Sequence, residues 1–274
     1  MNPFRLFPRR QSKRVVFVLG CQRSGTTMLE KLLGRHDGVT VYGEGDRRAM
    51  RVEAFYRFRE EDAIRKLIAC ARTPLVVFKP LNDSQHADRL RELHSDTKMI
   101  WIYRHYSDTI NSMIRKWGEN QKRIVHWIRD HASGERLRSW DGENWESIFA
   151  ERVSPESLRM VRELAGDDIS YEDGAGLVWT LRNQIYFDLR LDQDPDVLLV
   201  KYEDLVSSPE AGLAGIFRFI GLDGHGDYVG EIAASSVGKE PPPVLAPRIE
   251  ELCRGMLERL DEAMTAGIAG SAAG

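Results

Sequence analysis

Eight residues near the start of the chain have the order and composition of an anion-binding turn. Gly20–Thr27 (GCQRSGTT) follows the apolar run 15–19 and leads into a segment with the apolar spacing of a helix. A glycine-bounded loop between a strand and a helix brings backbone N–H groups to one point, beside the positive end of the helix. Arg23 adds a fork of N–H donors, and Thr26 and Thr27 add hydroxyls. These residues predict a phosphate-binding loop, rather than a glycine-bounded turn without a ligand.

The same loop lacks the residues of a nucleoside triphosphatase. The pattern GxxxxGK[ST] fits Gly20 and Gly25, but Thr26 stands where such enzymes have the lysine that reaches the β- and γ-phosphates. No apolar strand ends in the aspartate that would hold Mg²⁺. A P-loop kinase or nucleotidase is therefore the alternative enzyme, and a noncatalytic nucleotide-binding protein is the alternative from a different class.

A second group of polar residues follows a later strand. The apolar run 99–103 ends at Arg104, and Ser112 lies eight residues on, in a segment predicted to form a helix from about Ser107. Ser112 lies off the apolar stripe of that helix, so its hydroxyl is available to a ligand. Arg104 either binds a second phosphate or forms a salt bridge with the acidic pair 203–204.

The elements that must position these groups predict an α/β fold. Continuous apolar runs typical of strands buried on both faces occupy 15–19, 75–79, 99–104 and 197–202. Amphipathic patterns predict helices over 26–33, 87–93, 107–117, 208–220 and 247–264. We expect a P-loop-like three-layer fold, with a central parallel sheet of about four or five strands flanked by helices.

The chain reads as one domain over residues 1–274. We expect residues 1–13 to form a flexible basic N-terminus, 118–174 a helical insertion, and 265–274 a frayed tail of small residues. The insertion contains Trp127, Trp140 and Trp145, which either pack or contribute to acceptor binding.

Taken together, the motifs resemble those of sulfotransferases that use 3′-phosphoadenosine 5′-phosphosulfate (PAPS). Arg23–Thr27 matches the R-S-G-T-T loop of that family, and the spacing of Arg104 and Ser112 matches its 3′-phosphate motif. The run Tyr202–Val206 (YEDLV), followed by Pro-Glu and a helix ending in F-x-G-L, is the third match, so the resemblance covers most of 14–222. The arginine form of the loop is closer to the bacterial, tyrosylprotein and carbohydrate types than to the cytosolic phenol and steroid type. His105 and the tyrosine after it depart from the Asp-Pro or Asp-Gly that usually follows the family's arginine.

The resemblance implies how the donor is held. Backbone N–H groups of Ser24, Gly25, Thr26 and Thr27, together with Arg23, would hold the 5′-phosphosulfate, and Arg104 with Ser112 would hold the 3′-phosphate. Tyr202 belongs either to the adenosine pocket or to the core. Ser236 and Lys239 resemble a late loop that closes over the nucleotide, although a solvated loop would have the same composition.

Sulfuryl transfer by in-line displacement needs a base for the acceptor hydroxyl and cations for the leaving nucleotide, and this logic requires no metal. Glu44 follows a short β-like run and resembles the base of tyrosylprotein sulfotransferases, with His36 and His105 as alternatives. Lys79 ends a buried strand at the edge where α/β sheets bind ligands, so Lys79 and Arg23 are the candidates for charge stabilisation.

The acceptor is not specified by these residues. A hydroxyl of a carbohydrate, a phenolic or other small molecule, or a tyrosyl group all fit, and Trp179 and Asn183, one helical turn apart, either line the cleft or belong to the core.

Composition limits the other possibilities. The chain has 39 Lys plus Arg and 42 Asp plus Glu, a formal charge of −3, which argues against nucleic acid as a partner. Three cysteines at scattered spacing predict a reducing compartment, because they form no closed disulfide framework. Because no apolar run has the length of a spanning helix or a signal peptide, we expect a cytoplasmic protein of undetermined oligomeric state.

Overall fold

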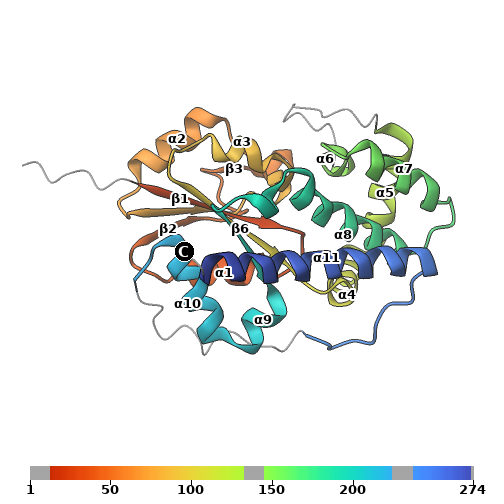
Figure 1. Ribbon diagram of the computed structural model, residues 1–274. Coiled ribbons are helices and arrows are strands. Elements are labelled where there is room, and N and C mark those ends of the chain that lie inside the picture. The colour runs from red at the N-terminus through yellow and green to blue at the C-terminus, as the bar shows by residue number, and fades with distance from the viewer. Residues whose placement is uncertain (1–12, 133–144, 224–236, 273–274) are drawn as a thin grey trace, which may run out of the picture.

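The structure, a computed structural model, describes residues 13–132, 145–223 and 237–272. Its centre is a five-stranded sheet in the order β2-β5-β1-β6-β7, with every neighbouring pair parallel (Figure 1). The strands are β1 (Arg14–Gly20), β2 (Val39–Tyr42), β5 (Leu75–Phe78), β6 (Thr97–Tyr103) and β7 (Val197–Lys201). The parallel sheet flanked by helices confirms the predicted fold class, including the short run before Glu44 as the edge strand β2.

The middle strand explains why the sequence has an unbroken apolar run there. β1 lies between β5 and β6, and all its residues after Arg14 are buried. Alternate side chains of a strand point to opposite faces. Accordingly, Phe17 and Leu19 enter one hydrophobic cluster while Val16 and Val18 enter the other. A strand covered on both faces therefore has no polar position to alternate with.

Helices form a layer on each side of the sheet (Figure 1). One face is covered by α1 (Thr26–Leu33), α9 (Tyr202–Ser207) and α10 (Pro209–Ile220). The cluster on the other face draws on α2 (Glu61–Cys70), α3 (Ala87–Arg91), α4 (Tyr106–Trp117), α5 (Asn120–His131), α8 (Tyr171–Asp188) and α11 (Pro247–Ala272). Short elements connect these layers, namely the strand pair β3 (Met50–Arg51) and β4 (Arg57–Phe58) and the 3₁₀ turns η1 (Val52–Ala54), η2 (Leu81–His86) and η3 (Leu191–Gln193).

The described part of the predicted insertion is mostly helical. Besides α5 it contains α6 (Trp145–Ala150) and α7 (Pro155–Leu164). Trp127 packs against the core and stacks on His131, as expected for a packing residue. Trp140 lies outside the described residues.

Helix α8 is the buried support of this side of the molecule. Thirteen of its 18 residues are buried, because α4, α5 and α11 all pack on it. Trp179 is fully buried and donates its indole N–H to the Arg104 carbonyl at 3.1 Å, while the Asn183 amide donates to the Trp179 carbonyl. The suggestion that these two side chains line the cleft is therefore wrong, and Trp179 instead fixes the end of β6.

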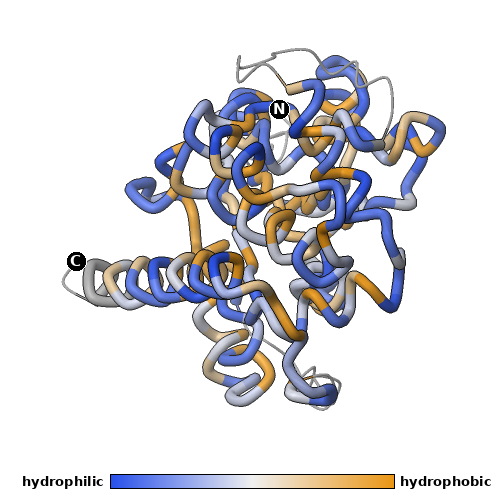
Figure 2. The backbone as a smooth tube through the Cα atoms, turned by 90° about the vertical axis from the view of Figure 1, so that its right-hand side faces the viewer, coloured by the Kyte–Doolittle hydropathy of each residue, from blue (hydrophilic) through white to orange (hydrophobic). Residues whose placement is uncertain are grey.

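Two helix ends differ from the sequence expectation. Helix α4 begins at Tyr106 rather than Ser107, because His105 is its N-cap and its Nδ1 accepts the Ser107 N–H at 3.2 Å. Helix α11 continues to Ala272, past the expected end near Met264. Figure 2 shows the C-terminal part of α11 extending beyond the rest of the described chain. None of the described helices combines the length and the apolar character needed to cross a membrane.

Candidate functional site

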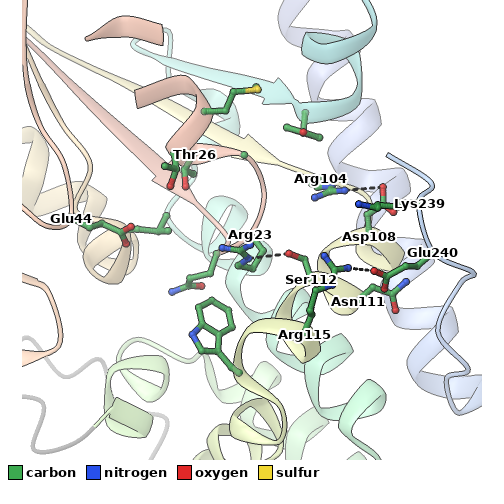
Figure 3. Close-up of a pocket in the computed structure, with 17 residues that line it drawn as sticks. Arg23, Thr26, Glu44, Arg104, Asp108, Asn111, Ser112, Arg115, Lys239 and Glu240 are labelled. Atoms are coloured by element: carbon green, nitrogen blue, oxygen red, sulfur yellow. Dashed lines mark hydrogen bonds and ion pairs between the residues drawn. The ribbon is translucent and has the colours of Figure 1, made fainter. Parts of the chain in front are cut away.

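A cleft of about 360 Å³ opens where the phosphate loop, the start of α4 and the segment 237–243 meet (Figure 3). Its walls include Arg23 and Thr26 from the first strand-to-helix junction and Arg104 and Ser112 from the second. The two junctions therefore face one space. This is the arrangement that a single nucleotide with two phosphate-bearing ends requires.

The backbone of the phosphate loop takes conformations that favour glycine. Gly25 has a φ of +94°, and a Cβ there would lie 2.3 Å from the Tyr202 ring. Gly20 has a φ of +136°, and a Cβ there would lie 2.2 Å from the Ile102 carbonyl oxygen. No side chain caps the start of α1. Within the first turn, the Met28 N–H donates to the Gly25 carbonyl, whereas the N–H groups of Thr26 and Thr27 are available to an anion in the cleft.

Arg23 connects the two junctions directly. Its Nε donates a hydrogen bond of 3.0 Å to Ser112 Oγ, and its guanidinium lies 5.9 Å from the centre of the Trp117 ring. Burial and the nearby positive charges of Arg104 and Arg115 lower the pKa of Arg23, while Glu44 acts in the opposite direction. These effects mark a place where positive charge is concentrated. Such a place favours a bound anion.

Arg104 stands at the carboxyl end of β6 with only 7% of its side chain exposed. It forms an ion pair of 3.1 Å with Asp108, one helical turn on, and lies 4.8 Å from the centre of the Tyr202 ring. The nearby carboxylate of Glu203 accepts the His105 N–H at 3.0 Å. Ser112, 8% exposed, accepts from Arg23, which leaves its own O–H to donate to a ligand.

Lys79 lies at the other side of the phosphate loop and is almost fully buried. Its Nζ is 2.6 Å from Glu30, 3.1 Å from Glu44 and 2.8 Å from the Thr27 hydroxyl. Glu44 lines the cleft and keeps 31% of its side chain exposed, so it can meet an acceptor. Figure 3 shows Glu44 at one end of the cleft and Arg104 at the opposite end, with Arg23 between them.

The remaining predicted site residues divide clearly. Thr27, Tyr202 and Lys239 line the cleft, whereas the buried Lys79 does not. Ser24 is fully buried and does not line the cleft, so a role through its backbone N–H is the one that its position allows. Ser236 lies outside the described residues.

The two histidines that the sequence offers as alternative bases make local contacts. His36 Nδ1 accepts the Gly38 N–H, and its Nε2 lies 3.2 Å from the Asp223 carbonyl oxygen. His105 caps α4 and stacks on Tyr106. Neither histidine lines the cleft, whereas Glu44 does.

Several cleft residues were not found from the sequence. The wall also contains Gln22, Asp108, Asn111, Arg115 and Glu240. Residues 104, 108, 111 and 115 recur at the spacing of one helix face, and this spacing could have predicted the polar stripe of α4. Glu30 could have been found through its position one turn after Thr27 in the predicted first helix.

A buried polar cluster is joined to the phosphate loop. Gln22 donates to the Asn82 side-chain oxygen at 3.0 Å, which joins the phosphate loop to the buried turn η2. In that turn Asp83 accepts from Arg57 at 2.6 Å. Arg57 also reaches Glu151 of the insertion at 2.8 Å.

Glu151 completes this cluster from the insertion side. Its second oxygen lies 2.8 Å from His86 Nε2 and accepts from Gln85 at 2.9 Å. Although burial disfavours its charge, the hydrogen bonds from His86 and Arg57 hold the pKa of Glu151 below its usual value.

Comparison with known proteins identifies the family. A family model described as a sulfotransferase domain matches residues 13–237. The chain belongs to the sulfotransferase family. It is therefore a PAPS-dependent sulfotransferase, as the sequence predicts, and the family leaves its acceptor unspecified. No curated protein matches the sequence.

Solved sulfotransferase structures are similar to this chain at low sequence identity. The sulfotransferase domain from the curacin biosynthetic pathway is 15% identical over 90% of this chain and 98% of that one, with a TM-score of 0.54. The sulfotransferase from Alicyclobacillus acidocaldarius is 16% identical over 93% and 95%, with a TM-score of 0.49. Mouse sulfotransferase SULT7A1, complexed with PAP, is 15% identical over 93% and 87%, with a TM-score of 0.46. The first of these likenesses supports the fold.

Proposed function

We propose that this sulfotransferase binds its donor between the two strand-to-helix junctions and transfers the sulfuryl group to an acceptor hydroxyl that enters beside Glu44. The observation that carries the proposal is the hydrogen bond from Arg23 to Ser112 across one cleft. It brings the loop assigned to the 5′-phosphosulfate and the helix assigned to the 3′-phosphate within reach of one nucleotide.

The residues of the cleft fit an anionic nucleotide. The hydrogen-bond donors of the cleft wall include the guanidiniums of Arg23 and Arg104, two threonine hydroxyls, the Ser112 hydroxyl and the uncapped start of α1. The backbone of Gly25 lies so close to the Tyr202 ring that a Cβ at residue 25 would collide with the ring. We assign the N–H groups of residues 24–27 and Arg23 to the 5′-phosphosulfate, and Arg104 and Ser112 to the 3′-phosphate. Tyr202 and Lys239 form further parts of the nucleotide wall.

Glu44 is the proposed general base. Its carboxylate takes the proton of the acceptor hydroxyl as the acceptor oxygen forms its bond to sulfur. Arg23 stabilises the negative charge that grows on the departing phosphate as the bond between sulfur and the bridging oxygen breaks. PAPS supplies the activated sulfuryl group for this displacement.

Besides its predicted role in charge stabilisation, Lys79 holds the proposed base in place. Its ammonium already contacts Glu30, Glu44 and Thr27, which accounts for its three N–H donors. Lys79 therefore fixes the direction of the Glu44 carboxylate. To contact the transferring group as well, it must give up one of these partners.

The acceptor class follows from the form of the site. A glutamate base and an arginine in the phosphate loop favour the tyrosylprotein and carbohydrate type over the phenol and steroid type. We therefore propose a carbohydrate or tyrosyl hydroxyl as the acceptor, with a phenolic or other small molecule as the alternative. Residues 118–174 of this single domain would contribute to its binding. The three cysteines, each a free thiol, support the proposed cytoplasmic location.

The direct test is a PAPS consumption assay across sugar, phenol, lipid and tyrosyl-peptide acceptors. With any acceptor that is sulfated, Glu44→Gln should keep the wild-type affinity for adenosine 3′,5′-bisphosphate and lose at least about a hundredfold in turnover. A nearly unchanged rate would remove Glu44 as the base. A larger thermal shift with Mg²⁺-ATP than with the bisphosphate would contradict the assignment of the nucleotide.

A further inference from the structure

One face of α4 carries a line of polar residues into the cleft. Asp108, Asn111, Ser112 and Arg115 recur every three or four residues, so they lie on the same side of the helix, and all of them line the cleft. Arg104 stands just before the first turn of the same line. The proposed function uses Arg104 and Ser112 and leaves Arg115 without a role.

The segment 238–241 is fastened along this face by three contacts. The Gly238 N–H donates to the Asp108 carboxylate at 3.1–3.2 Å, and the Asn111 amide donates to the Pro241 carbonyl at 3.0 Å. Arg115 forms an ion pair with Glu240 (Figure 3). The pair of Arg115 and Glu240 differs from the other two contacts because it joins two opposite charges that are both well exposed.

The ion pair between Arg115 and Glu240 is suited to exchange. The two side chains are 58% and 39% exposed, and an ion pair this accessible contributes little net free energy. A phosphate dianion offers Arg115 more charge and more acceptor oxygens than the glutamate does. Arg115 also lies one helical turn from Ser112, the hydroxyl assigned to the 3′-phosphate.

The charges around Ser112 point the same way. Arg23 donates to Ser112, and both Arg104 and Arg115 are close enough to Arg23 to lower its pKa together with its burial. Three guanidiniums, those of Arg23, Arg104 and Arg115, thus line the same cleft as Ser112. In the structure, two of them are paired with the carboxylates of Asp108 and Glu240.

We propose that Arg115 is a third side chain for the nucleotide 3′-phosphate, and that the phosphate replaces the Glu240 carboxylate on Arg115 when the nucleotide binds. The inference rests on the proposed function and extends it by one binding residue and one exchanged ion pair. Release of Glu240 leaves the segment 238–241 held to α4 by the Asp108 and Asn111 contacts. Arg115 thereby contributes to the selection of nucleotides that carry a 3′-phosphate.

The test compares two ligands by calorimetry on the full chain: adenosine 3′,5′-bisphosphate and adenosine 5′-monophosphate, which lacks the 3′-phosphate. Arg115→Ala should raise the Kd of the bisphosphate about tenfold and change that of the monophosphate by less than about twofold. Arg123→Ala is the matched control, because Arg123 is an exposed helical arginine that pairs with Glu146 away from the cleft lining.

Glu240→Gln tests the exchange itself. Removal of the competing carboxylate should tighten binding of the bisphosphate about two- to fivefold, and in the Arg115→Ala background the same substitution should have no effect. Equal weakening of both nucleotides by Arg115→Ala would overturn the inference. So would an effect of Glu240→Gln that persists without Arg115.

Arg104→Ala separates this inference from the proposed function. If the wild-type protein binds both nucleotides equally, the proposed 3′-phosphate site fails as a whole. If Arg104→Ala removes the preference for the bisphosphate but Arg115→Ala keeps it, the 3′-phosphate site stands and only the role of Arg115 is refuted.

Discussion

Replacement of Lys79 by methionine tests how the base is held. The ammonium lies 2.6 Å from one oxygen of Glu30 and 3.1 Å from one oxygen of Glu44, so these oxygens are at most 5.7 Å apart, the sum of the two distances. Two unit charges at about that separation repel by about 3 kcal/mol at an effective dielectric constant of 20, and by less than about 1 kcal/mol in water. Because both carboxylates are partly exposed, we expect Lys79→Met to lower the free energy of unfolding by about 1–3 kcal/mol.

A second substitution distinguishes repulsion from a simple loss of packing. In Lys79→Met/Glu30→Gln one of the two facing charges is gone, so about 1 kcal/mol or more of the unfolding free energy should return. Turnover should not return with it, because Glu44 still lacks the cation that directs its carboxylate. Glu30→Gln alone keeps the contact between Lys79 and Glu44, so we expect this variant to retain most of the wild-type turnover.

Urea unfolding gives the free energies, and steady-state turnover with a sulfated acceptor gives the activities. A double variant no more stable than Lys79→Met would refute the repulsion between the carboxylates. If Lys79→Met instead turned over as fast as the wild-type protein, Lys79 would have no part in directing Glu44 or in stabilising the transferring group.

Three further substitutions test the parts that support the cleft. Gly25→Ala should cost about 1–3 kcal/mol of stability and weaken nucleotide binding, since its φ is +94° and the Tyr202 ring occupies the space; thermal melting and calorimetry would show both, and a variant with unchanged affinity would contradict the tight approach. Glu151→Gln should destabilise the protein by about 3 kcal/mol at neutral pH. Because the pKa of Glu151 is lower in the folded protein than its unfolded value of 4.5, the Glu151 carboxylate stabilises the fold above pH 4.5, and this stabilisation is lost as the pH falls through the folded pKa. The difference in unfolding free energy between Glu151→Gln and the wild-type protein should therefore shrink in acid, and an unchanged difference in urea unfolding at low pH would argue against this. Trp179→Phe removes the N–H bound to the Arg104 carbonyl, so it should lower the free energy of unfolding by about 1 kcal/mol and weaken binding of the bisphosphate. The matched Trp127→Phe should leave that binding unaffected, and equal affinities in the two variants would mean that Trp179 does not help to place Arg104.

The sequence predicted best what backbone geometry alone decides. Strands buried on both faces leave unbroken apolar runs, and the order of strand, glycine loop and helix requires Gly25 in a particular conformation. These local requirements were enough to place Arg23 and Arg104 at the same edge of the sheet. The proposed binding residues 104 and 112 share a helix junction, so their relative position is also a local property.

Contacts between distant segments could not be predicted in the same way. The partners of Lys79 come from α1 and from the loop after β2, and no periodicity relates these segments. Likewise, Glu240 reaches Arg115 across 125 residues of sequence. Nor does any pattern in the sequence indicate that Trp179 packs under β6, because a buried helix such as α8 has no polar face to mark its orientation.

The ion pair between Glu151 and Arg57 limits how this enzyme can be re-engineered. Glu151 belongs to the segment proposed to choose the acceptor, whereas Arg57 and the buried turn that it joins belong to the nucleotide-binding body. A chimaera that receives the corresponding segment of another sulfotransferase without a carboxylate at this point would leave a buried guanidinium short of one partner. Transplants designed to alter substrate choice should therefore keep Glu151, or replace both members of the pair together with residues of matching volume.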